Sequence, residues 1–335
     1  MIPVDHPFWT VLLGVFGALF GSFLNVVVYR LPLGLSVVRP GSRCGACGTA
    51  IAPWNNVPVL SWLLLRGRAA CCGAPFSVRY PLVEAATTGL SVALWLRFAM
   101  PFGGEPPTTP VALAGWALTF TFACVLLAVA LIDLDTLRIP DVLSLPLIPL
   151  GILAAWAIGP AIHVTVEQSL LGLLIGGGTL LVITYGYFAL TGREGMGLGD
   201  YRLMAGVGAW LGWQSLLFLL MASAIQGLIF AAIVKLFRLE RHLPGLDDPD
   251  PVGFRDPEAA APVPPPESAE AQPAAPLQEV DAVPPAAPQG ARPAAAPPLA
   301  VPFGPFIALA ALEWLLFEPT LMQLLDHWLY GGLAR

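Results

Sequence analysis

Two aspartates that adjoin long apolar segments are the residues best suited to chemistry. Asp133 lies in LIDLDTLRIPD, at the end of the apolar run 111–132, and Asp200 closes the motif EGMGLGD at 194–200. Carboxylates at a hydrocarbon boundary are costly to desolvate and are functional candidates by default. Two carboxyl groups within a few ångströms share one proton near neutrality, so one can take a proton from water while the other polarises a peptide carbonyl. The pair therefore predicts aspartic peptide hydrolysis.

The glycines before Asp200 fit this chemistry. Gly195, Gly197 and Gly199 remove side chains beside the aspartate, so an extended substrate backbone can approach it closely. A phosphate-binding loop would need Lys followed by Ser or Thr where this motif has an acid, which excludes that alternative. Two further loop acids, Asp135 and Asp141, are equally well explained as solvated partners of nearby arginines.

The segments that carry these acids are membrane-spanning in composition. Of the residues, 56% are hydrophobic and only 11% are charged. About 20 helical residues cross a hydrocarbon core of about 30 Å. The uncharged apolar runs are 7–29, 111–132, 142–162, 169–190 and 216–234, with weaker candidates at 81–102, 203–213 and 301–317. We therefore expect an all-α fold, a polytopic transmembrane bundle of about eight segments with a small cytoplasmic loop domain.

The distribution of basic residues orients this bundle. With the N-terminus outside, the inner loops hold 14 of the 16 lysines and arginines. Positive charge on cytoplasmic loops sets orientation, so both termini are expected outside, in the periplasm, and the candidate carboxylates at the cytoplasmic face. The run 203–213 is too short to span the bilayer, and a short or re-entrant helix there would let water reach Asp200.

Composition divides the chain into five parts. We expect a first transmembrane helix at 1–30, a cytoplasmic cysteine-containing domain at 31–80, a peptidase core at 81–242 and a last transmembrane helix at 301–335. Between them, residues 243–300 hold 16 of the 35 prolines together with 15 alanines. Such a segment cannot bury enough apolar surface to offset its chain entropy, so a disordered cytoplasmic loop is predicted there.

Six blocks of sequence, in order, carry a resemblance to a known family. They are GSFLNVVVYRLP, PWNNVPVLSW, RYPLVE, LIDLDTLRIPD, GREGMGLGD and PFGPFIALA. The chain resembles the bacterial prepilin peptidases, type IV leader peptidases that share a GxGD motif with other intramembrane aspartic proteases. The resemblance implies that Asp133 and Asp200 are the catalytic pair and that Glu194, Gly197 and Gly199 support the substrate site.

The resemblance also implies the reaction and its partners. Family members cut a short basic leader from prepilins and pseudopilins after a glycine, at the cytoplasmic face of the inner membrane. Many then methylate the new N-terminus with S-adenosylmethionine. The expected partners are these substrates, the lipid bilayer and the pilus or type II secretion machinery, with no nucleic acid.

Four cysteines in the first inner loop suggest a metal site. Cys44 and Cys47 have CxxC spacing, and Cys71 and Cys72 are adjacent. Family members have two CxxC pairs here, consistent with a tetrathiolate zinc site, but Ala69 stands where one of those cysteines is expected. Three alternatives stay open: a distorted zinc site of four sulfurs, a three-thiolate site, or free thiols.

Two other classes of protein compete with a peptidase. A transporter would use acidic coupling residues, but these usually lie near the bilayer midplane rather than at one face. A scaffold of a secretion machine would use the loop 243–300 for docking. Within the spans, Asn25 and Gln226 are expected to hydrogen-bond between helices, and Glu313 has no evident partner.

Overall fold

The computed structural model describes residues 3–99, 107–192, 197–236 and 302–330. This part of the chain is helical, with two isolated β-bridges and no strand. The long helices are α1 (Pro7–Arg30), α3 (Arg79–Ala99), α4 (Thr109–Thr136), α5 (Asp141–Ile162), α6 (Val166–Thr191), α8 (Leu216–Leu236) and α9 (Gly304–Tyr330). Two shorter ones are α2 (Leu60–Leu64) and α7 (Leu198–Leu211). The loop at 243–300 lies outside the described residues, so its predicted disorder stays a prediction.

Six of the described helices are long and apolar enough to cross a membrane: α1, α3, α4, α5, α6 and α8 with the turn before it. The expected all-α transmembrane bundle is thereby confirmed, whereas the number eight is not. Of the remaining candidates, α7 has 14 residues. At 1.5 Å per residue it rises about 21 Å, less than the roughly 30 Å of the hydrocarbon core. The expectation of a short helix after Asp200 is met.

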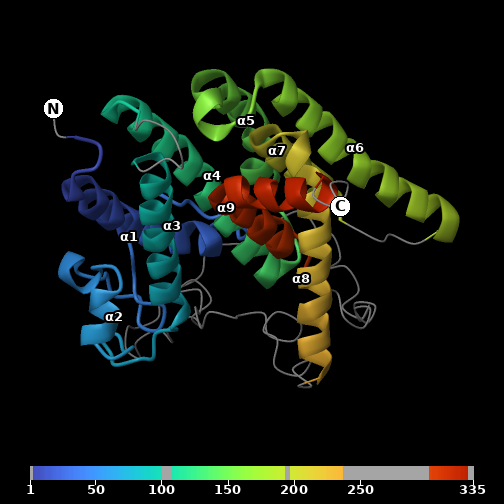
Figure 1. Ribbon diagram of the computed structural model, residues 1–335. Helices are drawn as coiled ribbons and strands as arrows, with labels where there is room; N and C mark the ends of the chain where they lie inside the picture. The colour runs from blue at the N-terminus through green and yellow to red at the C-terminus, as the bar shows by residue number, and fades with distance from the viewer. Residues whose placement is uncertain (1–2, 100–106, 193–196, 237–301, 331–335) are drawn as a thin grey trace, which may run out of the picture.

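The helices form two groups joined by a central pair. Figure 1 shows α1 beside α3 on one side of the molecule and α5, α6 and α7 on the other. Between them, α4 contacts α3, α5 and α9, and α9 also contacts α7 and α8. The helices that carry the two candidate aspartates, α4 and α7, thus lie in the middle of the bundle.

Helices approach closely where glycines face each other. A Cβ added at Gly172 of α6 would lie 2.1 Å from the carbonyl oxygen of Gly208 on α7, and one at Gly208 would lie 2.2 Å from that of Gly172. Small residues permit such backbone contact between helices in membranes. On the other side, a Cβ at Gly21 of α1 would lie 2.1 Å from Thr87 Oγ1 of α3. These contacts fix α7 against α6 and α1 against α3.

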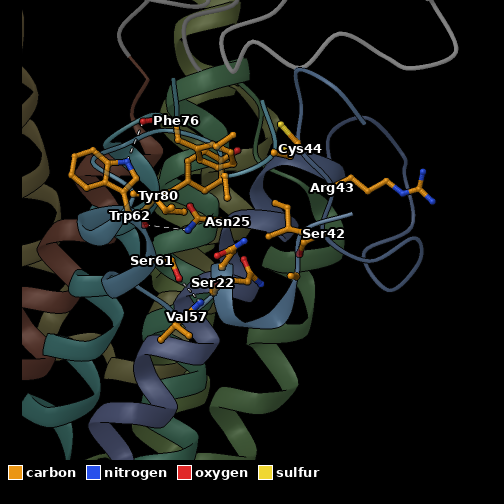
Figure 2. Close-up of a pocket in the computed structure, with 18 of the residues that line it drawn as sticks. Ser22, Asn25, Ser42, Arg43, Cys44, Val57, Ser61, Trp62, Phe76 and Tyr80 are labelled. Carbon is orange, nitrogen blue, oxygen red and sulfur yellow. Dashed lines mark hydrogen bonds between the residues drawn. The ribbon is translucent and has the colours of Figure 1, made fainter. Parts of the chain in front are cut away.

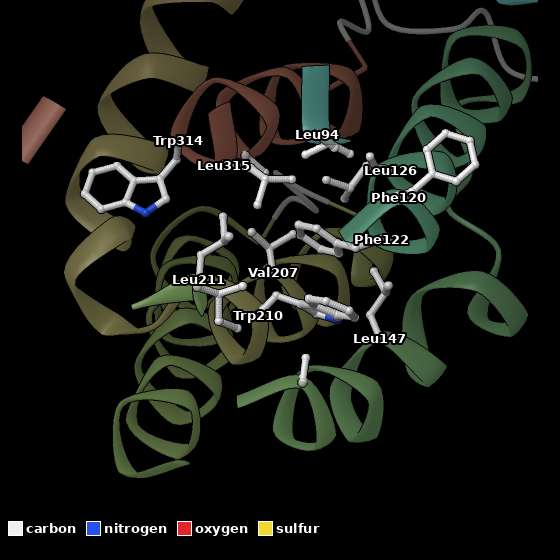
Figure 3. Close-up of a cluster of buried hydrophobic side chains, with 14 of the residues drawn as sticks. Leu94, Phe120, Phe122, Leu126, Leu147, Val207, Trp210, Leu211, Trp314 and Leu315 are labelled. Carbon is white, nitrogen blue, oxygen red and sulfur yellow. The ribbon is translucent and has the colours of Figure 1, made fainter. Parts of the chain in front are cut away.

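The core around α7 is aromatic and aliphatic. Phe122 of α4 stacks on Trp210 of α7, with ring centroids 4.6 Å apart and planes 13° apart (Figure 3). Val207 lies beside this stack, and Trp314 and Leu315 approach from α9. Because α7 buries side chains toward several helices at once, it is a core element and not a lipid-facing span.

Polar residues within the spans connect neighbouring helices. The amide nitrogen of Asn25 donates to the Tyr80 carbonyl, at 3.3 Å, and that of Gln226 donates to the Glu313 carboxylate, at 2.9 Å. The predicted interhelical hydrogen bonds are therefore present, and Glu313 has a partner that the sequence did not indicate.

Candidate active site

Asp133 and Asp200 come from different helices and meet at one end of the bundle. Asp133 lies in the last turn of α4 and Asp200 in the first turn of α7. Only 5% of Asp133 and 8% of Asp200 is exposed, and the two carboxyl groups are close enough for their charges to interact. The structure thus brings together two acids that are 67 positions apart in the sequence.

The N-terminus of α9 fixes the carboxyl group of Asp133. The backbone N–H of Gly304, the first residue of α9, donates to Asp133 Oδ2 at 3.0 Å. A Cβ added at Gly304 would lie 2.7 Å from the same oxygen, so only glycine leaves room for this contact. Helix N-termini favour negative charge, and Asp200 in the first turn of α7 has the same advantage.

Ile139 packs between the N-terminus of α7, which carries Asp200, and the N-terminus of α9, which contacts Asp133. A Cβ added at Gly199 would lie 2.8 Å from Ile139 Cβ, and one at Gly304 would lie 3.1 Å from Ile139 Cδ1. The chain can place Ile139 there because Leu137 ends α4 in the left-handed conformation, with φ of 53°. One aliphatic side chain therefore sets the spacing between the α7 and α9 N-termini.

The glycines near Asp200 differ in what faces them. A Cβ at Gly197 would lie 3.6 Å from Asp200 Oδ2, an ordinary contact, and this residue is exposed. Gly199 instead faces Ile139, so packing within the protein requires the glycine at this position. Glu194 lies outside the described residues, as does Gly195.

The neighbouring acids are held in ion pairs. Asp135 Oδ2 lies 2.7 Å from an Arg79 guanidinium nitrogen, and Asp141 pairs with Arg202. Among the described residues, no basic side chain forms an ion pair with Asp133 or Asp200. In the described part of the chain, the two exposed or half-buried acids are therefore paired with arginines, whereas the two buried aspartates have no basic partner. Asp135 and Asp141 are thus accounted for as structural acids.

The four loop cysteines form a compact cluster. All four Sγ atoms lie within 4.8 Å of one another. The Cys44–Cys72 sulfurs are 3.7 Å apart and the Cys47–Cys71 sulfurs 3.3 Å apart. A tetrahedron of sulfurs about 2.3 Å from a zinc ion has edges of about 3.8 Å. The cluster therefore has the size that a tetrahedral metal ion needs.

Two similar turns supply these sulfurs. In the first, the Cys44 N–H donates to the Thr49 carbonyl and the Gly48 N–H donates to the Cys44 carbonyl, both at 2.8 Å. The second turn repeats both hydrogen bonds at the same lengths with Ala69, Ala74 and Gly73. Each turn is closed by an isolated β-bridge. Ala69 thus occupies the place of Cys44, which agrees with the register break in the sequence.

Cys71 supplies the fourth sulfur from a different position. Cys72 is the equivalent of Cys47, and Cys71 precedes it, with its sulfur 3.9 Å from that of Cys72. Hydrogen bonds from the side chain and backbone of Thr49 lower the pKa of Cys47 to about 6. The hydrogen bond with Cys47 raises the pKa of Cys71 to about 12. Near neutrality Cys47 is therefore mostly the thiolate, which is the form that binds a metal ion.

A pocket of about 280 Å³ lies apart from the two aspartates. Its walls are α1, the start of α3 and the cysteine-containing loop, and Figure 2 shows Asn25, Trp62 and Tyr80 around it. Neither Asp133 nor Asp200 lines it. The aspartate pair and the pocket are thus separate, although both lie near the same end of α3 and α4. Sequence analysis anticipated the carboxylates and the cysteines but not the pocket.

Comparison with known proteins gives consistent matches along the chain. The family described as the bacterial peptidase A24 N-terminal domain matches residues 15–98, and the type IV leader peptidase family matches residues 120–232. No solved structure matches the chain.

Three curated relatives share the name prepilin leader peptidase/N-methyltransferase. The protein of Myxococcus xanthus (strain DK1622) is 35% identical over 336 residues, covering 95% of this chain and 93% of that protein. The protein of Dichelobacter nodosus is 35% identical over 268 residues, covering 72% and 88%. That of Aeromonas hydrophila is 38% identical over 237 residues, covering 64% and 77%. With the helical bundle and the family matches, these relatives establish that the chain belongs to the type IV leader peptidase family.

Proposed function

We propose that this protein is an aspartic endopeptidase that removes the leader of prepilins or pseudopilins. The observation that carries the proposal is the buried pair Asp133 and Asp200, whose charges interact at one end of the bundle. The family and the names of its relatives supply the substrate class. We further propose that this end of the bundle lies at the cytoplasmic face of the bacterial inner membrane, with both termini in the periplasm, and the excess of arginines in the inner loops supports this orientation.

The pair can hydrolyse a peptide bond by acid–base chemistry. One carboxylate takes a proton from a water molecule held between the two acids, and the water oxygen attacks the scissile carbonyl carbon. The other carboxyl group, still protonated, hydrogen-bonds to the carbonyl oxygen and then transfers its proton as the intermediate forms. Breakdown returns a proton to the leaving amine. The exposed Gly197 leaves space beside Asp200 for the substrate backbone, and Glu194 is a candidate supporting acid.

The same protein is proposed to methylate the amine that cleavage releases. Two relatives that cover most of the chain are named as methyltransferases. S-adenosylmethionine would supply the methyl group. We further propose zinc as the ion of the cysteine cluster, bound by Cys44, Cys47, Cys71 and Cys72, because thiolate sulfurs at these spacings suit its tetrahedral preference. Association with pilus or type II secretion machinery follows from the substrate.

Mass spectrometry of a co-expressed prepilin tests the cleavage and the methylation together. The prepilin is expressed in cells that lack their own prepilin peptidase, with or without this protein, and its intact mass and N-terminal peptide are measured. We expect a shortened chain that begins after the leader glycine and carries one added methyl. A prepilin that keeps its leader whenever this protein is correctly inserted in the membrane would refute the peptidase assignment.

A further inference from the structure

The short helix α2 is apolar on two faces, and only one of them packs on the protein. The face toward the pocket described above, with the residue after the helix, consists of Ser61, Trp62 and Leu65. The opposite face, at positions i, i+3 and i+4, consists of Leu60, Leu63 and Leu64. All three of these leucines are exposed, Leu64 to 82%. A helix that is apolar all round is one that is buried, so the outer face of α2 needs a second apolar environment.

A turn before α2 extends this outer face. Trp54 is 75% exposed, and Val57 is exposed as well. Ser61 holds the turn against α2, because its hydroxyl group donates to the Trp54 carbonyl at 3.2 Å and accepts the Val57 N–H at 2.9 Å. We call this surface the α2 patch, and its members are Trp54, Val57, Leu60, Leu63 and Leu64. Exposed apolar surface of this kind marks a contact with another protein or with a membrane.

Hydrogen bonds place α2 alongside the membrane-spanning helices and not beyond their ends. The N–H of Val59, which directly precedes α2, donates to Glu84 Oε2 of α3 at 2.7 Å. Ser22 of α1 hydrogen-bonds to the same carboxyl group. Ser22 lies eight positions before Arg30, the end of α1, which at 1.5 Å per residue is about 12 Å. Interfacial helices bury their apolar faces about 5–10 Å into the boundary between headgroups and acyl chains, so α2 lies deep enough to reach it.

The cysteine turns lie at the other end of the pocket. Figure 2 shows Val57 and Ser61 beside Ser22, with Cys44 at the opposite end of the pocket from Val57. Figure 1 shows α2 beside the start of α3. Of the two parts of the loop, α2 therefore lies deeper along the spanning helices than the turn that carries Cys44.

The loop that carries the α2 patch is basic and contains no acid. Residues 31–78 include neither aspartate nor glutamate, and their basic residues are Arg39, Arg43, Arg66 and Arg68. A zinc ion with four thiolates has a net charge of about −2, which would still leave the loop positive. Arg66 comes just after α2, is exposed, and forms no ion pair with any acid in the described part of the chain. Anionic phospholipids complement this charge, whereas a basic substrate leader would be repelled by it.

We propose that the α2 patch inserts into the lipid leaflet on the aspartate side of the membrane, with Arg66 at anionic phospholipid headgroups. The leucines enter the acyl boundary, and Trp54 takes the interfacial position that tryptophan favours. This docking fixes the cysteine-containing loop against the membrane. Arg79, which follows the loop, pairs with Asp135 of α4, so the docked loop also borders the helix that carries Asp133. The docking does not depend on the activities proposed above.

Photo-crosslinking of the full-length protein in lipid nanodiscs tests the insertion. The nanodiscs contain equal parts of phosphatidylcholine and phosphatidylglycerol, and mass spectrometry measures phospholipid adducts after irradiation. One sample carries Leu64→p-benzoylphenylalanine. The matched control carries Ala46→p-benzoylphenylalanine, at an exposed position in the turn that contains Cys44. Burial of one leucine favours an apolar environment about tenfold or more, so we expect about tenfold more adduct at position 64 than at position 46.

The charge of Arg66 is tested in the same background as Leu64→p-benzoylphenylalanine. One arginine at an anionic surface contributes about a fivefold preference, so Arg66→Gln should lower the ratio of phosphatidylglycerol to phosphatidylcholine adducts about fivefold. Lys235→Gln is the matched control. It removes one positive charge from the last turn of α8, which Figure 1 shows across the molecule from α2, and should leave the ratio unchanged.

Leader cleavage by each variant shows that the protein is folded and inserted. If the Leu64 variant does not cleave, quenching of tryptophan fluorescence by brominated phosphatidylcholine decides instead: the wild type should lose an emission component that Trp54→Phe lacks. Equal phospholipid adducts at positions 64 and 46 would overturn the proposal, as would crosslinks from position 64 to a second copy of this chain. An adduct ratio that Arg66→Gln leaves unchanged would overturn the role of that arginine.

Discussion

Gly304→Ala probes the contact that positions Asp133. The added methyl carbon would lie 2.7 Å from Asp133 Oδ2, about 0.7 Å inside the 3.4 Å at which ordinary van der Waals contact begins. Ile139 Cδ1 lies 3.1 Å from the same added carbon, so a shift of the helix backbone toward Ile139 cannot relieve the clash. The carboxyl group must therefore move, and its 3.0 Å hydrogen bond from the Gly304 N–H lengthens.

Two independent arguments give the size of the effect. A hydrogen bond to a charged group contributes about 1.5–3 kcal/mol, which corresponds to a factor of about 10 to 100 in rate. A displacement of about 1 Å of a catalytic group costs about a hundredfold. We expect kcat for leader removal to fall between about 10-fold and 100-fold. Global stability should change little, because the substitution is at the first residue of a helix.

The assay is cleavage of a purified prepilin by enzyme in detergent, with initial rates measured by gel densitometry. Gly227→Ala is the matched control: it lies on α8 against the same helix α9, and its added Cβ would make only an ordinary contact, at 3.5 Å from Phe306. Equal rates for Gly304→Ala, Gly227→Ala and the wild type would show that the α9 N-terminus does not position the aspartate.

Three further predictions concern the cysteine turns and the helix contacts. The double variant Ala69→Cys/Cys71→Ala should bind one zinc ion as the wild type does, measured by metal analysis, because position 69 is the equivalent of Cys44; loss of the metal would contradict that equivalence. In the metal-free protein at pH 7, Cys47 should be alkylated by iodoacetamide faster than Cys71, because a pKa of about 6 leaves it mostly thiolate and a pKa of about 12 leaves Cys71 a thiol. Below about pH 6 the difference between the two alkylation rates should shrink, because Cys47 becomes protonated. Equal labelling of Cys47 and Cys71 at pH 7 would show that Cys47 is not the more acidic thiol. Gly172→Leu should lower the melting temperature strongly, because its Cβ would lie 2.1 Å from the Gly208 carbonyl oxygen, whereas Gly178→Leu, with nothing within 4 Å, should not.

Long apolar runs and charge made most of the bundle predictable from sequence. The membrane-spanning helices follow from uninterrupted hydrophobicity, and the two aspartates stand out because each adjoins such a run. The number of spans was less predictable, because α7 is apolar for a different reason: its side chains fill the core between other helices. Composition alone does not separate burial in protein from burial in lipid.

Contacts between distant segments were not predictable. Gly304 lies in the block PFGPFIALA, which marks the family resemblance, but its contact with Asp133 joins residues 171 positions apart. Ile139 and Gly199 meet only because the turn at Leu137 redirects the chain. In the cysteine loop, the sequence showed the displaced register at Ala69. That Cys71 nevertheless brings a fourth sulfur to the cluster depends on how two turns fold against each other.

The most direct test of the central claim is leader removal by Asp133→Asn and Asp200→Asn, each measured by intact mass spectrometry on a prepilin incubated with the purified variant. Both changes keep the size of the side chain and remove the acid. We expect no shortened prepilin from either variant, or from the double variant, while insertion and melting temperature stay near the wild type. Continued removal of the leader by either single variant would contradict a reaction carried out by these two carboxyl groups together.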